Sequence, residues 1–114
     1  MLSPDILKSL LEFREERDWK QFHSARNLAA ALSVEASELL EHFIWASDAQ
    51  TPQIATERRA EIRHEMADIA ILLSYLASDL EIDLDDAVRQ KLEINRAKYP
   101  VQQSKGSNKK YTEL

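Results

Sequence analysis

The sequence predicts an all-α protein built as a bundle of four helices. Two observations indicate this fold class. Apolar residues recur at helical spacing along four segments, and the 114 residues include one glycine and three prolines, so few turns are available. The length and composition suit one compact domain, which we place at residues 1–100, followed by a flexible tail at residues 101–114.

The first helix is predicted to start at Pro4, because Ser3 can cap it and proline suits the first helical position. Its apolar stripe is narrow, and it should end near Asp18. The aromatic segment WKQFH at residues 19–23 then connects it to the second helix, for which Ser24 is the expected cap.

The second helix is predicted to run to about Ala46. The third begins either at Pro52 or after Thr56, since both positions are plausible N-termini, and it continues to about Leu80.

A fourth helix should follow Asp83, which can cap it. Asp85 and Asp86 would lie in its first turn, where negative charge is favourable. It stops before Pro100. From Val101 onward the chain is polar and lacks apolar periodicity, which predicts the flexible tail.

Two pairs of carboxylates are the strongest functional signal. Glu35 and Glu38 on the second helix, and Glu65 and Asp68 on the third, are each spaced three residues apart and so share a helix face. The pairs mirror each other about the polar stretch at residues 47–56. An antiparallel hairpin folded there would bring all four side chains to one level of the bundle.

Glu35 falls in the middle of an apolar stripe, where an unpaired charge is strongly unfavourable. It must therefore be protonated, paired or bound to a metal. Four ionised carboxylates at close range would repel each other, and a hard cation such as Mg²⁺, with Mn²⁺ as an alternative, would relieve that repulsion. Solvated acidic faces are the plainer interpretation of such pairs. The apolar stripe that surrounds Glu35 on the second helix comprises Leu28, Leu32, Leu39 and Phe43.

Composition excludes several classes of function. The chain has no cysteine, so disulfides, zinc–thiolate sites and thiol nucleophiles are absent. The net charge of −5 disfavours broad contact with a nucleic-acid backbone, so we expect no nucleic-acid partner. No apolar run has the length of a membrane span and no signal peptide is evident, so we expect a cytoplasmic protein with no membrane partner.

A ferritin-like di-metal site is the nearest competing metal site, because it also places carboxylates inside a helical bundle. It requires a Glu-x-x-His motif on two helices. This chain offers one, Glu61 to His64, and His64 projects away from Glu65 and Asp68.

Aromatic residues flank the carboxylate helix. Trp19, Phe22 and His23 precede it and Trp45 ends it, and flat rings near a cationic centre suit a nucleobase whose phosphates are bound to metal. Ordinary core or interface roles are the alternative for each ring.

The last helix carries Asn95 in its apolar stripe, with Lys91 on the shoulder. A buried amide needs a partner, so Asn95 is expected to bond either a backbone group or a ligand.

Three stretches carry a family resemblance: DWKQFHSARNLAAALSVEASELLEHFIW, EIRHEMADI and KLEINRAKYP. They are similar to the MazG-like, all-α nucleoside triphosphate pyrophosphohydrolases, and within them to the dCTP pyrophosphatase branch. E-x-x-E followed by E-x-x-D is that family's Mg²⁺ site, which the resemblance places on the four carboxylates named above.

The resemblance also implies substrate contacts. It puts Trp19, His23 and Trp45 around the base, and Lys91 and Asn95 on the triphosphate or sugar. Leu72 departs from the family pattern, since the relatives carry a tyrosine against the substrate at this position. Tyr75 projects about 60° away from position 72 around the helix, so it is not expected to take that role.

The implied activity is Mg²⁺-dependent conversion of a nucleoside triphosphate, dCTP or a modified dCTP, to the monophosphate and pyrophosphate. Glu35 and Glu38 are the candidates to orient or deprotonate the attacking water. The resemblance further implies a homo-oligomer, a dimer or tetramer, and a small-residue face on the third helix agrees with it. The alternative is a non-catalytic helical nucleotide-binding or assembly module.

Overall fold

The computed structural model describes residues 1–114 and contains helices and turns but no strand, so the predicted all-α class is confirmed. It has six α-helices where four were predicted. They are α1 (Pro4–Glu16), α2 (Ala25–Glu41), α3 (Thr51–Glu57), α4 (Arg59–Asp79), α5 (Leu84–Lys98) and α6 (Val101–Ser104), with short 3₁₀ turns at Lys20–Phe22, Asp48–Gln50 and Tyr111–Glu113.

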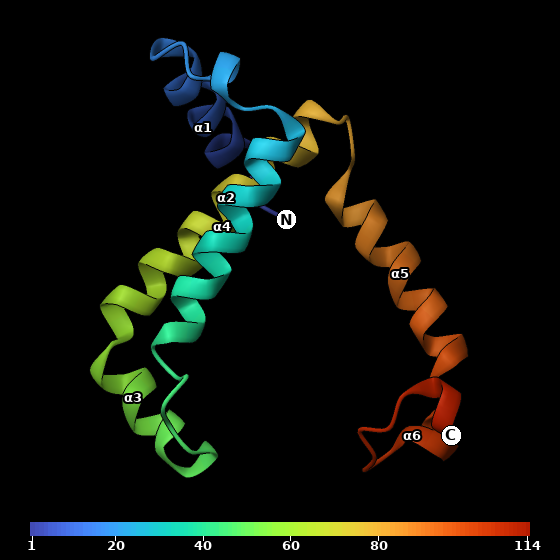
Figure 1. The fold of residues 1–114 in the computed structure, drawn as a ribbon. Coiled ribbons are helices and arrows are strands. Elements are labelled where there is room, and N and C mark those ends of the chain that lie inside the picture. The colour runs from blue at the N-terminus through green and yellow to red at the C-terminus, as the bar shows by residue number, and fades with distance from the viewer. The chain divides into compact units, whose positions relative to one another are not determined.

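The chain forms two compact units, residues 2–81 and residues 82–114 together with Met1. The first holds α1 to α4 and the second holds α5 and α6 (Figure 1). Because the predicted four-helix bundle includes the helix at Leu84–Lys98, which belongs to the second unit, that bundle stays a prediction.

The three predicted helix caps are confirmed. The Ser3 hydroxyl accepts from the Ile6 amide at 3.4 Å, and the Ser24 hydroxyl accepts from Asn27 at 3.1 Å. Asp83 accepts from the Asp86 amide at 3.2 Å. Each cap supplies an acceptor to an amide that has no partner within its own helix.

Two predicted helix ends differ from the structure, and the third predicted helix is divided in two. The first helix ends at Glu16, and Asp18 follows in the left-handed region with φ +53°, a conformation that aspartate tolerates. The second ends at Glu41, and residues 42–45 form turns. Both predicted starts of the third are used, because Arg58, with ψ +24°, separates α3 from α4. Neither glycine nor proline marks that break.

Helices α2 and α4 lie side by side along most of their lengths and form the main packing of residues 2–81 (Figure 1). They run in opposite directions: Glu35 shares a cavity with Asp68, while His42, further along α2, bonds Glu65, which is earlier on α4. The buried apolar residues are Leu28 of α2 with Tyr75 and Ala77 of α4. The expected antiparallel hairpin is therefore present.

A buried ion pair ties α1 to the end of α4. Arg14 is 4% exposed, and its two terminal nitrogens donate to the two oxygens of Asp79 at 2.9 and 2.7 Å. The guanidinium also lies 4.6 Å from the centre of the Tyr75 ring, whose hydroxyl donates to the Leu10 carbonyl at 2.9 Å. These contacts fix α1 against α4 through polar groups as well as apolar ones.

In the second unit, the predicted tail contains α6 and a closing 3₁₀ turn. Tyr111 in that turn packs edge-on against Tyr99 with ring centres 6.0 Å apart, and the Lys98 ammonium lies 4.6 Å from the Tyr111 ring centre. The flexibility of this segment stays a prediction. None of the helices combines the length and apolar character that crossing a bilayer requires.

Replacing Asp79 with asparagine should lower the free energy of unfolding by about 3 kcal/mol, because it leaves the buried Arg14 charge without its anionic partner. Chemical denaturation at neutral pH measures the change. The matched control is Glu12→Gln in the exposed Lys8–Glu12 pair, which is 3.9 Å apart and should contribute under about 1 kcal/mol.

The loss of stability caused by Asp79→Asn should depend on pH. The Arg14 hydrogen bond lowers the pKa of Asp79, so its contribution is present above the ordinary value of 3.8 and is lost as the pH falls from there through the lowered pKa. If the free energies of unfolding of the parent and the Asp79→Asn variant differed by the same amount at pH 7 and pH 2, an ionic contribution would be contradicted.

Candidate functional site

The α2–α4 hairpin brings the four predicted carboxylates into one another's electrostatic range. Burial raises the pKa of Glu35 above its ordinary value of 4.5. A hydrogen bond with Glu38 and the charges of Glu38, Asp68 and Glu65 raise it further. All three other members of the predicted set thus act on Glu35.

This donor set fits a hard divalent cation. Its ligands are all carboxylate oxygens, and their mutual repulsion would fall when positive charge is bound. In the arrangement described, no three acidic or histidine side chains converge closely enough to hold an ion. Glu65 instead bonds the His42 ring, with 2.5 Å between its Oε2 and His42 Nε2.

His42 is a site residue that the sequence analysis did not select. Its Nε2 atom faces a Glu65 carboxylate oxygen, which only accepts, so Nε2 carries a proton and donates it, while Nδ1 is buried without a hydrogen-bond partner. The signal was available, since His42 lies four residues after Glu38 and therefore on the same face of the helix. Only the facing helix shows which side chain it reaches.

A cavity of about 410 Å³, here called the Trp19 cavity, joins two of the carboxylates to two of the predicted base-binding residues. This volume is within the usual range of small-molecule sites. Trp19 is 44% exposed and stacks edge-on against Phe13, with ring centres 5.7 Å apart. The cavity is lined by Leu10, Phe13, Trp19, His23, Glu35, Asp68, Ile71, Leu72 and Tyr75.

Leu72 and Tyr75 both line the Trp19 cavity. Tyr75 is 5% exposed, and its hydroxyl already donates to the Leu10 carbonyl. It is therefore part of the wall and does not supply a free hydroxyl in place of the tyrosine that the sequence lacks at position 72.

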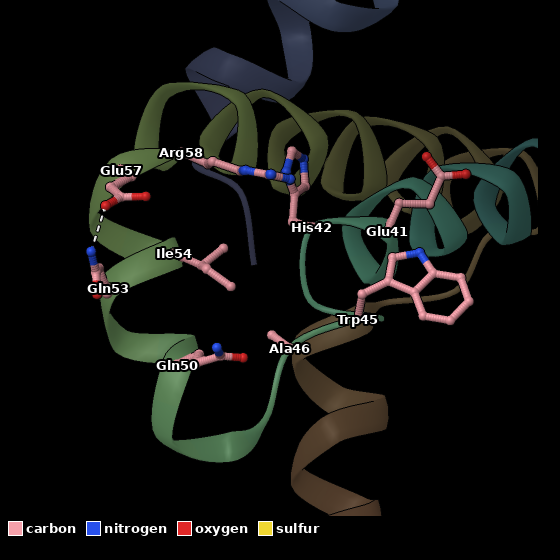
Figure 2. A pocket seen from close by; sticks show the side chains of 9 residues that line it. All are labelled: Glu41, His42, Trp45, Ala46, Gln50, Gln53, Ile54, Glu57 and Arg58. Atoms are coloured by element: carbon pink, nitrogen blue, oxygen red, sulfur yellow. Dashed lines mark hydrogen bonds between the residues drawn. The ribbon is translucent and has the colours of Figure 1, made fainter.

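Trp45 lies elsewhere, on a second cavity of about 320 Å³ formed by the end of α2, α3 and the turns between them (Figure 2). Its side chain is 94% exposed. Within residues 2–81, the structure thus joins Trp19 and His23 in one cavity and places Trp45 in another. This Trp45 cavity is lined by Glu41, His42, Trp45, Ala46, Gln50, Gln53, Ile54, Glu57 and Arg58.

Lys91 and Asn95 lie on α5, in the second unit, where Lys91 is exposed and Asn95 is half-buried. Their contact with a triphosphate or sugar stays a prediction. Glu61 and His64, the fragment of a ferritin-like motif, are both exposed on α4.

Comparison with known proteins decides the family. The sequence pattern of the MazG-like family matches residues 30–114, which include all four carboxylates. The chain belongs to the MazG-like family. The resemblance expected from the E-x-x-E and E-x-x-D motifs is therefore confirmed, and the ferritin-like alternative is not supported.

Two curated relatives carry the same name, dCTP pyrophosphatase 1. The rat protein (Rattus norvegicus) is 46% identical and the human protein (Homo sapiens) 45% identical, each over 112 residues and 96% of this chain. The chain spans 66% of the length of either relative. The predicted similarity to the dCTP pyrophosphatase branch is thus confirmed.

A solved structure supports the same fold. A pyrophosphatase from Archaeoglobus fulgidus DSM 4304 is 39% identical and superimposes with a TM-score of 0.83. The match covers 84% of this chain and 90% of the archaeal chain.

Replacing Glu38 with glutamine should stabilise the metal-free protein at pH 7, because it removes the charge nearest to Glu35 and retains a hydrogen-bonding group. The gain should vanish below pH 4.5 and grow as the pH rises through the raised pKa of Glu35, where ionisation disfavours the folded state. Thermal melting in a chelating buffer across this pH range measures it.

The matched control is Glu41→Gln, an exposed acid on the same helix but outside the four carboxylates. It should leave the melting temperature nearly unchanged at every pH. A Glu38→Gln protein that melts well below the parent in chelator would show that the cluster carries no electrostatic strain.

Proposed function

We propose that this chain is a Mg²⁺-dependent nucleoside triphosphate pyrophosphohydrolase that converts dCTP, or a modified dCTP, to the monophosphate and pyrophosphate. The observation that carries the proposal is that the α2–α4 hairpin places E-x-x-E and E-x-x-D within electrostatic range of each other, beside a cavity lined by Trp19 and His23. The names of the curated relatives and of the archaeal pyrophosphatase agree with it.

Glu35, Glu38, Glu65 and Asp68 are the proposed metal ligands. When bound, Mg²⁺ supplies positive charge to the phosphate oxygens and acidifies an attacking water. Mn²⁺, which takes similar oxygen ligands, is the expected substitute. His42 leaves one Glu65 oxygen free, so its hydrogen bond would orient the carboxylate rather than compete for it.

Glu35 and Glu38 are the proposed catalytic residues. Hydrolysis at the α-phosphorus forms a bond from the water oxygen and breaks the bond to the pyrophosphate oxygen, and a base must take the water's proton. Glu35 suits this role because it lines the Trp19 cavity beside the candidate base-binding residues. Glu38 hydrogen-bonds to it and would share the proton.

The base is proposed to enter the Trp19 cavity, where a half-exposed indole and a histidine lie beside Glu35 and Asp68. Trp45 would cover the base or sugar from outside this cavity. Lys91 and Asn95 are proposed to contact the triphosphate or sugar. A long cationic side chain and an amide suit those groups.

We further propose a cytoplasmic homo-oligomer, a dimer or tetramer. Many large apolar side chains are exposed on α2 and α4, as expected of a chain that buries them against copies of itself. They include Val34 at 56%, Leu40 at 56% and Met66 at 57%. A neighbouring subunit would also cover Trp45.

Replacing Asp68 with asparagine should abolish pyrophosphate release from dCTP and also the rise in melting temperature that Mg²⁺ gives the parent. Ligand binding at a hundred times the dissociation constant stabilises a fold by about 2.7 kcal/mol, which a thermal scan detects readily. A nucleotide panel with and without Mg²⁺ measures activity.

The matched control is Glu61→Gln, an exposed acid two turns earlier on α4, which should keep both responses. A parent that releases no pyrophosphate from any nucleotide would favour the non-catalytic binding module instead.

Replacing Trp45 with alanine should raise the Michaelis constant for dCTP by about fivefold to a hundredfold, the equivalent of losing one stacked base. Stability should change by less than about 0.5 kcal/mol, because the side chain is 94% exposed in the single chain. Steady-state kinetics and denaturation of the same preparations separate the two effects.

Trp45→Phe is the control, since it keeps an aromatic face and should retain most of the affinity. An unchanged Michaelis constant in the alanine variant would exclude Trp45 from the substrate site. A change of oligomeric state would assign it to a subunit interface.

A further inference from the structure

Arg14 does more than pair with Asp79. Its Nη1 atom, which donates to Asp79 at 2.9 Å, also lies 3.5 Å from Nδ1 of His23. Tyr75 packs against both partners, with its ring centre 4.6 Å from the guanidinium carbon and 5.5 Å from the His23 ring. The buried arginine therefore faces one defined nitrogen of the His23 imidazole.

This contact decides where the imidazole carries its proton. A guanidinium only donates hydrogen bonds, so the nitrogen facing it must be an unprotonated acceptor. Burial and the positive charge of Arg14 both lower the pKa of His23, which keeps the ring neutral near pH 7. The single ring proton is then on Nε2, on the side of the ring away from Arg14.

His23 lines the Trp19 cavity together with Trp19, Glu35 and Asp68. Because Nδ1 is occupied by Arg14, Nε2–H is the polar group that the ring can offer to a ligand there. Glu35 and Asp68 present acceptors in the same cavity, so the donors facing a base there are His23 Nε2–H and the indole N–H of Trp19.

We propose that Arg14 is a positioning residue for base selection: it fixes His23 as an Nε2–H donor that reads the N3 acceptor of cytosine and disfavours uracil and thymine. Uracil and thymine carry N3–H at that edge, so two donors would face each other and one would stay unpaired. The inference rests on the proposed function and specifies its substrate class.

A mismatch of this kind leaves a desolvated polar group without a partner, which should cost about tenfold or more in kcat/KM. The parent should therefore use dCTP at least tenfold better than dUTP and dTTP. The analogue 3-deaza-dCTP, in which a C–H replaces N3, should lose a similar factor, mainly through KM.

The His23 variants separate donation from shape. His23→Gln places an amide donor near the position of Nε2 and should keep a preference for dCTP over 3-deaza-dCTP, whereas His23→Leu should lose it. Equal use of the two nucleotides by the parent, or an unchanged preference in His23→Leu, would overturn the inference.

The Arg14 test replaces both members of the ion pair, in the double variant Arg14→Met/Asp79→Leu. Exchanging a buried ion pair for apolar residues is often neutral for stability, so the double variant should fold. Arg14→Met alone would leave the buried Asp79 charge without a partner and should destabilise the protein. It should lose the preference for dCTP over dUTP while keeping a kcat on dCTP within a few-fold of the parent.

Nitrogen NMR gives a readout that a merely structural role would not move. Long-range ¹H–¹⁵N spectra of the parent should show His23 in the Nε2–H form alone, and the double variant should show both tautomers. The His23 signals are assigned by their absence from His23→Gln. The control is Arg17→Met, directly after the same helix, whose guanidinium lies over the Phe13 ring.

The outcomes distinguish this inference from the proposed function. An active parent that uses dCTP, dUTP and dTTP equally, or that shows His23 in the Nδ1–H form, overturns the inference alone. A parent inactive on every nucleotide overturns both.

Discussion

The buried ion pair between Arg14 and Asp79 fixes α1 against α4, and the candidate base-binding residues Trp19 and His23 follow directly after α1. An arginine that is 4% exposed can be tolerated only because both oxygens of Asp79 accept from it. The pair holds α1 on the end of α4, and the chain then has to return to α2 through the short connector that carries Trp19 and His23. Leu10 and Phe13 of α1, the helix that this pair holds against α4, line the Trp19 cavity.

The carboxylate site depends on a different constraint, the register of α2 against α4. Antiparallel packing brings two pairs of acids within electrostatic range, and burial, a hydrogen bond with Glu38 and the neighbouring charges together raise the pKa of Glu35. Such a cluster disfavours folding in the absence of a cation, so it indicates a function in binding rather than in stability. His42 offsets part of the repulsion by donating a hydrogen bond to Glu65.

The two halves of the proposed site have contrasting chemistry and separate origins in the chain. Oxygen ligands for a hard cation come from the middle of the hairpin, whereas the aromatic surface for a base comes from the connector after α1. They meet in one cavity, since its lining includes Glu35 and Asp68 as well as Trp19 and His23. A nucleotide has the same two parts, a flat base and a chain of metal-binding phosphates. This correspondence links the cavity to the nucleotide chemistry of the MazG-like family.

The sequence by itself predicted the helix starts and one group of candidate metal ligands. Ser3, Ser24 and Asp83 predict the helix starts because capping is a local hydrogen bond between near neighbours. Glu35, Glu38, Glu65 and Asp68 predict one cluster because helical period and hairpin symmetry together fix which faces meet. Both inferences use only geometry that repeats along the chain.

Only the tertiary structure decided which side chains from distant segments touch. In the sequence, Arg14 is one charged residue on a helix with a narrow apolar stripe, and its partner Asp79 is 65 positions away. His42 reaching Glu65, Arg14 facing one nitrogen of His23, and Trp45 lying outside the Trp19 cavity likewise follow from how α1, α2 and α4 pack. The physical reason is that a buried polar group takes whichever partner the packed helices bring within hydrogen-bond distance, and no period along the chain encodes that distance.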